Sequence, residues 1–406
     1  MDERYYKRVE WRRTTICRVV AHSREVDALV NRPIAVLVAT CLALVEVATW
    51  AQPTAGARDA SPSRLTALDP RWTLSFEGAP AAPAGFDREM AYVATKTGDL
   101  IAFSLDDGAA RWRIGLPTQF TPATGDGLVF ACAERTITAL EQRSGRETWH
   151  LDLESPIGAP PYWDGGTLFV STETGELIAI RGEDGRIVWR APLASPIAAT
   201  PTTSRDRLFT ALRDGRLAAV GIAGGETIWT HALNEPISGM LALQEQLLVG
   251  TKANRLHSFS LDRGRARWSQ KVGADVIGSP TADEQLIYFV AYDNVLRALA
   301  RRSGNLRWTR SLPSRPSGGP IRVENVVLVS LAAKAMGAYL ATTGAEAFTI
   351  PAAGEVTGAA FLRDNVRLTL PRVIAQTREG ALQGFAPRVE PPPAALADLP
   401  GVKVGS

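Results

Sequence analysis

An aromatic residue recurs about every forty positions along most of this chain, and this spacing constrains the fold more than any other feature of the sequence. Seven of these aromatics also stand four residues after a glycine and ten residues after a small residue in an apolar stretch. Self-similarity at this period predicts an architecture in which each repeat packs against its neighbours. The recurring residues are Trp72, Trp112, Trp149, Trp189, Trp229, Trp268, Trp308 and Phe348.

Each repeat carries the sequence signals of four short strands. An apolar run such as residues 168–170 leads to a hairpin signal such as Thr174-Gly175, where glycine tolerates a positive φ. A strand with a Leu-x-Ala pattern follows, and the glycine turn then leads into the aromatic strand, while a fourth short segment precedes the apolar run. Four antiparallel strands that cannot bury both faces alone are typical of a propeller blade. The sequence therefore predicts an all-β fold.

The two ends of the repeat array predict the number of blades. Seven complete blades end at the aromatics from Trp112 to Phe348, whereas the last repeat reaches Pro387 before a fourth strand can form, because proline cannot continue a ladder. Trp72 has no preceding strands of its own. We expect an eight-bladed β-propeller of four-stranded antiparallel blades, in which the N-terminal strand completes the last blade and closes the ring.

The repeated tryptophans are expected to have a structural role. An indole between two adjacent sheets buries a large apolar area and can dock on the backbone of the next blade. A ligand-stacking cage would instead need the aromatic residues at one point, and a repeat spreads them around a ring. Cys132 lies in an apolar run and is expected to be a buried small apolar residue.

The N-terminal region resembles an export signal. Residues 34–45 form an uncharged run. This run is too short to span a bilayer but fits the core of a signal peptide. Small residues that suit cleavage end at Ala51 and at Ala57. Lipid attachment at Cys41 and an uncleaved anchor stay open, and translation could begin at Val26 or Val30, since no methionine lies between Met1 and Met90.

The expected organisation has five segments. Residues 1–33 are the leader n-region or a misassigned start, and residues 34–57 are the signal core and cleavage region. A linker (58–68) precedes the eight-bladed propeller (69–388), and a proline-rich disordered tail (389–406) follows it. The leader holds the whole net charge of +3, so the near-neutral remainder has no global attraction to nucleic acid.

The Gly-x-x-x-Trp turn, the Leu-x-Ala strand and the Thr/Asp-Gly hairpin resemble the PQQ-like repeat with its tryptophan-docking motif, over about residues 72–388. That family includes quinoprotein alcohol dehydrogenases and the outer-membrane assembly factor BamB, which this chain resembles more in length and ring closure. The resemblance implies a non-catalytic, periplasmic protein-interaction scaffold, possessing no cofactor, whose partner is a periplasmic or outer-membrane protein such as the barrel-insertion component. We expect a monomer that binds no nucleic acid.

Two features weigh on this resemblance. Relatives in the BamB role are typically lipoproteins with extended loops between blades, whereas connections such as residues 191–196 are short here. The alternative is a ligand- or quinone-binding propeller, either a sensor or a dehydrogenase-like enzyme. A quinoprotein dehydrogenase usually carries adjacent cysteines, which this sequence lacks, and its histidines do not have metal-ligand spacing. We therefore expect neither catalytic nor metal-binding residues.

The fifth and sixth repeats are rich in arginine, which is the most distinctive charge feature of the sequence. Their exposed side chains could form a solvated surface or a docking patch for an acidic partner. A docking patch should gather on one rim of the ring, whereas a solvated surface should spread along the outer strands. The candidate partner patch is Arg263, Arg265, Arg267, Arg301 and Arg302.

Overall fold

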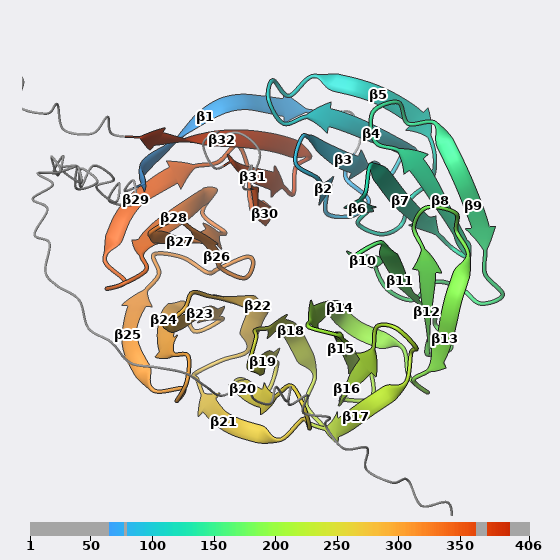
Figure 1. The fold of residues 1–406 in the computed structure, drawn as a ribbon. Coiled ribbons are helices and arrows are strands. Elements are labelled where there is room, and N and C mark those ends of the chain that lie inside the picture. The colour runs from blue at the N-terminus through green and yellow to red at the C-terminus, as the bar shows by residue number, and fades with distance from the viewer. Residues whose placement is uncertain (1–64, 77–78, 363–371, 390–406) are drawn as a thin grey trace, which may run out of the picture. The chain divides into compact units, whose positions relative to one another are not determined.

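The computed structural model describes residues 65–76, 79–362 and 372–389, and these form a ring of eight four-stranded antiparallel sheets (Figure 1). The predicted all-β, eight-bladed propeller is confirmed. Blades 1 to 4 comprise β2 (Gly85–Phe86), β3 (Met90–Ala94), β4 (Asp99–Ser104) and β5 (Ala110–Gly115); β6 (Ala123–Gly125), β7 (Leu128–Ala133), β8 (Thr136–Glu141) and β9 (Glu147–Asp152); β10 (Tyr162–Asp164), β11 (Thr167–Ser171), β12 (Glu176–Arg181) and β13 (Ile187–Pro192); β14 (Ile197–Ser204), β15 (Arg207–Leu212), β16 (Arg216–Gly221) and β17 (Thr227–Ala232).

The other half of the ring repeats this order. Blades 5 to 7 and the closing blade comprise β18 (Ile237–Ala242), β19 (Gln246–Thr251), β20 (Arg255–Ser260) and β21 (Ala266–Lys271); β22 (Val276–Ala282), β23 (Leu286–Ala291), β24 (Val295–Ala300) and β25 (Leu306–Ser311); β26 (Ile321–Val323), β27 (Val326–Leu331), β28 (Ala335–Leu340) and β29 (Glu346–Pro351); β30 (Val356–Leu362), β31 (Arg372–Thr377), β32 (Ala381–Val389) and β1 (Leu65–Ser75).

The closing blade joins both ends of the repeat array, as the sequence predicts. β1 lies antiparallel to β32, with Trp72 opposite Gly384 (Figure 1). β1 begins at Leu65, inside the segment expected to be linker, because Leu65 and Leu68 are buried in the core beside blade 7. This part of β1 contains Pro70. Proline is tolerated there because β1 is an edge strand and the pairing register shifts between Pro70 and Trp72. At the other end, β32 reaches Val389, the first residue of the expected tail.

The middle strands of each blade supply the core because sheets cover both of their faces. β3 is buried at every position, whereas the outer strand β5 alternates between exposed and half-buried residues. For seven of the repeat aromatics, the small residue ten positions earlier lies directly opposite the aromatic on the neighbouring strand, as Ala179 lies opposite Trp189. Because that small residue is fully buried, the constant spacing reflects a cross-strand pair at the blade interface.

The repeat tryptophans connect each blade to the next. Six indole N–H groups donate to a backbone carbonyl of the following blade over 2.7–3.1 Å. These pairs are Trp72 to Leu105, Trp112 to Gln142, Trp149 to Gly182, Trp189 to Ile222, Trp229 to Leu261 and Trp308 to Ala341. The eighth aromatic, Phe348, pairs with Ala338 across the strands and has no N–H to donate.

Trp268 is the exception among these tryptophans. Its Nε1 is buried and has no hydrogen-bond partner within the described ranges. The carbonyl 33 residues further on, that of Arg301, instead accepts a hydrogen bond of 2.7 Å from Nε2 of the buried Gln246. The interface between blades 5 and 6 therefore combines a buried glutamine with an unsatisfied indole.

This exception predicts unequal costs for the same substitution. We expect Trp189→Phe to lower the free energy of unfolding by about 1 kcal/mol more than Trp268→Phe, because only Trp189 loses a hydrogen bond and leaves a carbonyl without that donor. Urea unfolding of both variants, followed by circular dichroism, measures the difference. Equal losses would show that the docking hydrogen bond adds nothing to the packing of the ring.

Candidate functional site

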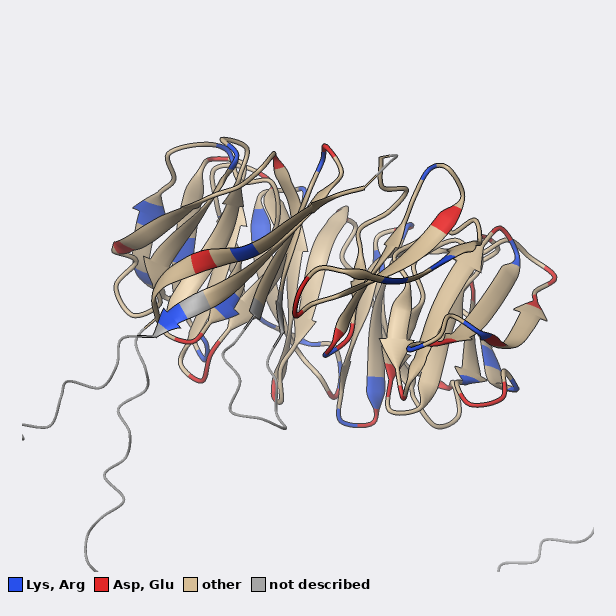
Figure 2. Cartoon of the chain, turned by 90° about the horizontal axis from the view of Figure 1, so that it is seen from above, with Lys and Arg blue, Asp and Glu red and all other residues tan. Residues whose placement is uncertain are grey.

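The propeller presents two faces with different kinds of loop. The turns between the first and second strands of a blade, and between its third and fourth strands, lie on one side, which we call the turn face. The blade-to-blade connections and the hairpins between second and third strands lie on the opposite side, the connection face. Figure 2 shows Lys and Arg as well as Asp and Glu on the loops of both sides, so neither face is uniformly charged.

The repeat aromatics do not form a common site. Each lies on the outer strand of its own blade, so the structure spreads them around the ring instead of bringing them together (Figure 1). Their indoles cover a glycine of the next blade; a Cβ at Gly185, for example, would lie 2.8 Å from the Trp149 ring. This geometry makes them part of the blade interface.

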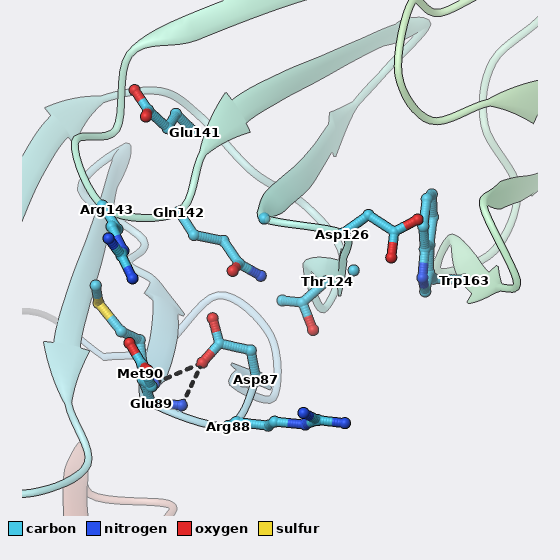
Figure 3. Close-up of a pocket in the computed structure, with 12 residues that line it drawn as sticks. Asp87, Arg88, Glu89, Met90, Thr124, Asp126, Glu141, Gln142, Arg143 and Trp163 are labelled. Atoms are coloured by element: carbon cyan, nitrogen blue, oxygen red, sulfur yellow. Dashed lines mark hydrogen bonds between the residues drawn. The ribbon is translucent and has the colours of Figure 1, made fainter. Parts of the chain in front are cut away.

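One hollow lies on the turn face of blades 1 to 3 and has a volume of about 880 Å³ (Figure 3). The β2–β3 turn borders it with Asp87, Arg88 and Glu89, which Figure 3 shows opposite Arg143 of the β8–β9 turn. Asp126 lies at the other end, beside Trp163 (Figure 3). The sequence did not predict this hollow, because its lining comes from separate turns of three blades.

Trp163 is the one lining residue that a sequence signal could have revealed, since it is a tryptophan outside the forty-residue pattern. It stacks on Phe130 with ring centroids 5.0 Å apart. A Cβ added at Gly125 or at Gly182 would overlap the indole, so both glycines are needed for its position. Trp163 is thus a wedge between blades 2 and 3 that presents only part of its surface to the hollow.

Asp87 is occupied by its own turn. Its carboxylate accepts hydrogen bonds from the backbone N–H groups of Glu89 and Met90 and from the Tyr92 hydroxyl, each 2.6 Å long. Burial, followed by this hydrogen bond, raises the pKa of Tyr92 far above its ordinary value, so the phenol stays protonated and donates. Asp283 and Tyr288 repeat the arrangement in blade 6. This carboxylate therefore stabilises a turn.

Within the described residues, no three His, Cys, Asp or Glu side chains gather where they could hold a metal ion. Cys132 is buried, as expected, and burial raises the pKa of its thiol to about 12, so it is protonated at neutral pH. In the same part of the chain, no helix is long and apolar enough to cross a membrane.

The connection face carries a smaller hollow of about 340 Å³ at blades 6 and 7 and the closing blade. Tyr292, which is 44% exposed, lies beneath the guanidinium of Arg315, whose carbon is 4.0 Å from the ring centroid. Glu355 and Arg378 form an ion pair of 3.1 Å at its edge. The aromatic ring and both arginines are thus engaged with neighbours within the hollow.

Four of the five arginines of the candidate patch lie on the turn face. Arg263 and Arg265 belong to the β20–β21 turn of blade 5, and Arg301 and Arg302 to the β24–β25 turn of blade 6. Arg267 lies in the outer strand β21, and its guanidinium donates to the Glu245 carbonyl over 3.0 Å. The structure therefore places the arginines on two adjacent turns and one outer strand.

The ring, its composite closure and its docked tryptophans together define an eight-bladed propeller of the PQQ-like class. The family model described as outer membrane protein assembly factor BamB matches residues 61–157, 133–241 and 213–367. The chain belongs to this family. No curated protein matches the sequence.

Solved structures share the fold at low sequence identity. BamB from Moraxella catarrhalis is 16% identical with a TM-score of 0.64, over 79% of this chain and 100% of that one. Sqt1 from Saccharomyces cerevisiae is 10% identical (TM-score 0.67; 79% and 100% covered), and the quinohemoprotein alcohol dehydrogenase from Comamonas testosteroni is 12% identical (TM-score 0.65; 81% and 78% covered). An outer-membrane protein assembly factor and an alcohol dehydrogenase therefore share this ring.

Proposed function

We propose that this protein is a non-catalytic, periplasmic interaction scaffold that assists outer-membrane protein assembly. The observation that carries the proposal is the BamB family match, which extends through almost the whole ring. Two groups in the hollows agree with it, because Asp87 stabilises its own turn and Glu355 pairs with Arg378. A rigid ring with two broad loop-bearing faces suits protein binding, since little conformational entropy is lost when it docks.

Site-specific photo-crosslinking in the native cell envelope tests this function. A photoreactive residue is placed at Lys252 on the connection face, at Glu284 on the turn face, or at Leu306 on an outer strand, all of which are exposed. We expect one loop-bearing face to capture the barrel-insertion component, as identified by mass spectrometry, and the Leu306 position to serve as the matched control.

Two results would contradict the scaffold. Equal capture from all three positions would indicate non-specific contact, because a docked partner covers only part of the ring. Failure to capture any envelope protein, together with a quinone chromophore retained by the purified ring, would replace the scaffold with the cofactor-binding alternative. Absorption spectroscopy of the protein purified from its own envelope detects such a chromophore.

Export through the N-terminal signal is part of this proposal. We expect the mature protein to begin after Ala51 or Ala57, residues that lie outside the described ranges. N-terminal sequencing and intact-mass measurement of protein from the envelope check this. A full-length leader would indicate an anchor, and a diacylglycerol adduct at Cys41 would indicate a lipoprotein.

A further inference from the structure

The glycine turns between third and fourth strands allow one blade to be compared with another. In five of the seven turns described, the side chain before the glycine accepts a hydrogen bond from the backbone N–H of the residue after it. Such a local bond stabilises a turn. The accepting residues are Asp107, Ser144, Asp184, Ser303 and Thr343.

Blade 5 departs from this pattern by placing an arginine at the same position. Arg263 cannot accept a hydrogen bond, so the N–H of Arg265 donates to Ser260 Oγ instead, over 3.2 Å. The other exception is Gly224 in blade 4, which has no side chain at all. A turn that keeps a locally unfavourable residue is where a functional requirement is expected.

The charges of the turns also differ between blades. In blade 3, Asp184 pairs with both Arg181 and Arg186, and in blade 2, Glu141 pairs with Arg146. In blade 5 the acid of the turn, Asp262, faces Arg205 and Arg207 of blade 4. On the glycine turns of blades 5 and 6, Arg263, Arg265 and Arg302 are exposed, and their guanidiniums have no hydrogen bond or ion pair within the described ranges.

The two turns that carry these free guanidiniums are held firmly by the preceding blades. Arg207 Nη1 of blade 4 donates to the Leu261 carbonyl of blade 5 over 2.9 Å. Gln246, at the equivalent position of blade 5, donates from Nε2 to the Arg301 carbonyl of blade 6. Arg301 Nη1 in turn donates to the Asp283 carbonyl over 3.2 Å. The charges are therefore presented from fixed backbone, which reduces the entropy lost on binding.

We propose that Arg263, Arg265 and Arg302 form a docking surface for an acidic peptide segment of a protein partner; this rests on the proposed scaffold function and adds the chemistry of the partner. A guanidinium binds carboxylates through paired hydrogen bonds, and unpaired exposed cations on adjacent turns complement a run of Asp and Glu. Arg267 and Arg301 support this surface through their backbone contacts.

Charge reversal on the glycine turns tests the surface. The Arg265→Glu/Arg302→Glu variant is compared with Arg146→Glu/Arg186→Glu, which changes the net charge equally at exposed positions on other glycine turns. Binding of a fluorescent peptide of alternating Asp and Ser is measured by anisotropy at two salt concentrations. We expect the first variant to lose about tenfold in affinity and the second to change by less than about twofold.

A third variant, Arg263→Asp, separates binding from stability. Its carboxylate can accept the N–H of residue 265, as Asp184 does for Arg186, so we expect peptide binding to fall while the midpoint of thermal unfolding stays the same or rises. A loss of binding that accompanies a lower midpoint would overturn the assignment. Binding to phosphatidylglycerol vesicles that matches the peptide affinity would also overturn it, in favour of a lipid surface.

The docking surface and the scaffold function can fail separately. Equal peptide binding by both double variants, with capture of the barrel-insertion component unchanged, would eliminate the arginine surface and leave the scaffold function in place. Selective peptide binding without any captured envelope protein would support the surface and eliminate the proposed role in assembly.

Discussion

Deletion of the chain through Ser75 is expected to abolish cooperative folding of the whole propeller. The deletion removes β1, and with it the buried Leu65 and Leu68 and the indole of Trp72, which packs on Gly108 of blade 1. Loss of several core side chains costs more than about 5 kcal/mol, which is comparable to the entire stability of a typical domain. Circular dichroism melting should show no sharp transition.

Deletion through Arg58 is the matched control, because it leaves β1 complete. We expect its melting temperature to equal that of the full chain. A cooperative transition in the longer deletion, at an unchanged temperature, would mean that the closing blade is stable with three strands and that closure adds nothing.

Gly145→Ala is expected to lower the free energy of unfolding by about 2–4 kcal/mol. Gly145 has a φ of +70°, which disfavours a side chain, and an added Cβ would lie 2.8 Å from the Trp112 indole. The backbone contributes about 1 kcal/mol of this loss and the overlap with the ring contributes the remainder. Urea unfolding measures the change.

Gly127 in the same blade provides the control for this substitution. Its φ of +79° is as unfavourable for alanine, but no atom lies within 4 Å of the added Cβ. We expect Gly127→Ala to cost only about 1 kcal/mol. Equal losses at both glycines would show that the indole moves aside freely and that docking against glycine contributes little to the ring.

The fold was predictable from the sequence because the signal is repeated. Any one turn of the type Gly-x-x-x-Trp is weak evidence, but six of them and a seventh that ends in Phe348, at nearly constant spacing, fix the strands on either side. The pairing of Ala179 with Trp189 explains the ten-residue interval. The incomplete last repeat and the isolated Trp72 likewise predicted the closure that β1 and β32 form.

Residues that depart from the repeat were not predictable in the same way. Glu134 and Lys334 occupy hairpin positions with positive φ, where other blades have glycine or asparagine, so these hairpins carry no turn signal. The hydrogen bond from Gln246 to Arg301 crosses 55 residues between two blades. Such contacts depend on how neighbouring blades stack, and the local pattern contains no information about that.

The arginine turns and the hollow of blades 1 to 3 were likewise only partly predictable from the sequence. The arginine-rich repeats were visible in the composition of the chain, but only the structure distinguishes the free guanidiniums of Arg263 and Arg302 from that of Arg301, which is bound to a carbonyl. The hollow around Asp87 and Asp126 combines three blades and was missed for that reason.

The pairing of β1 with β32 also has a consequence for the order of events during synthesis. The ion pair between Asp69 and Arg388 joins residues 319 positions apart, so the first strand of the ring has no partner until nearly the whole propeller has been made. Contacts of such long sequence separation form slowly, and an unpaired strand edge invites wrong pairing in the meantime. The emerging chain must therefore keep β1 unpaired and soluble while seven blades assemble, which makes closure the last and most vulnerable step of folding.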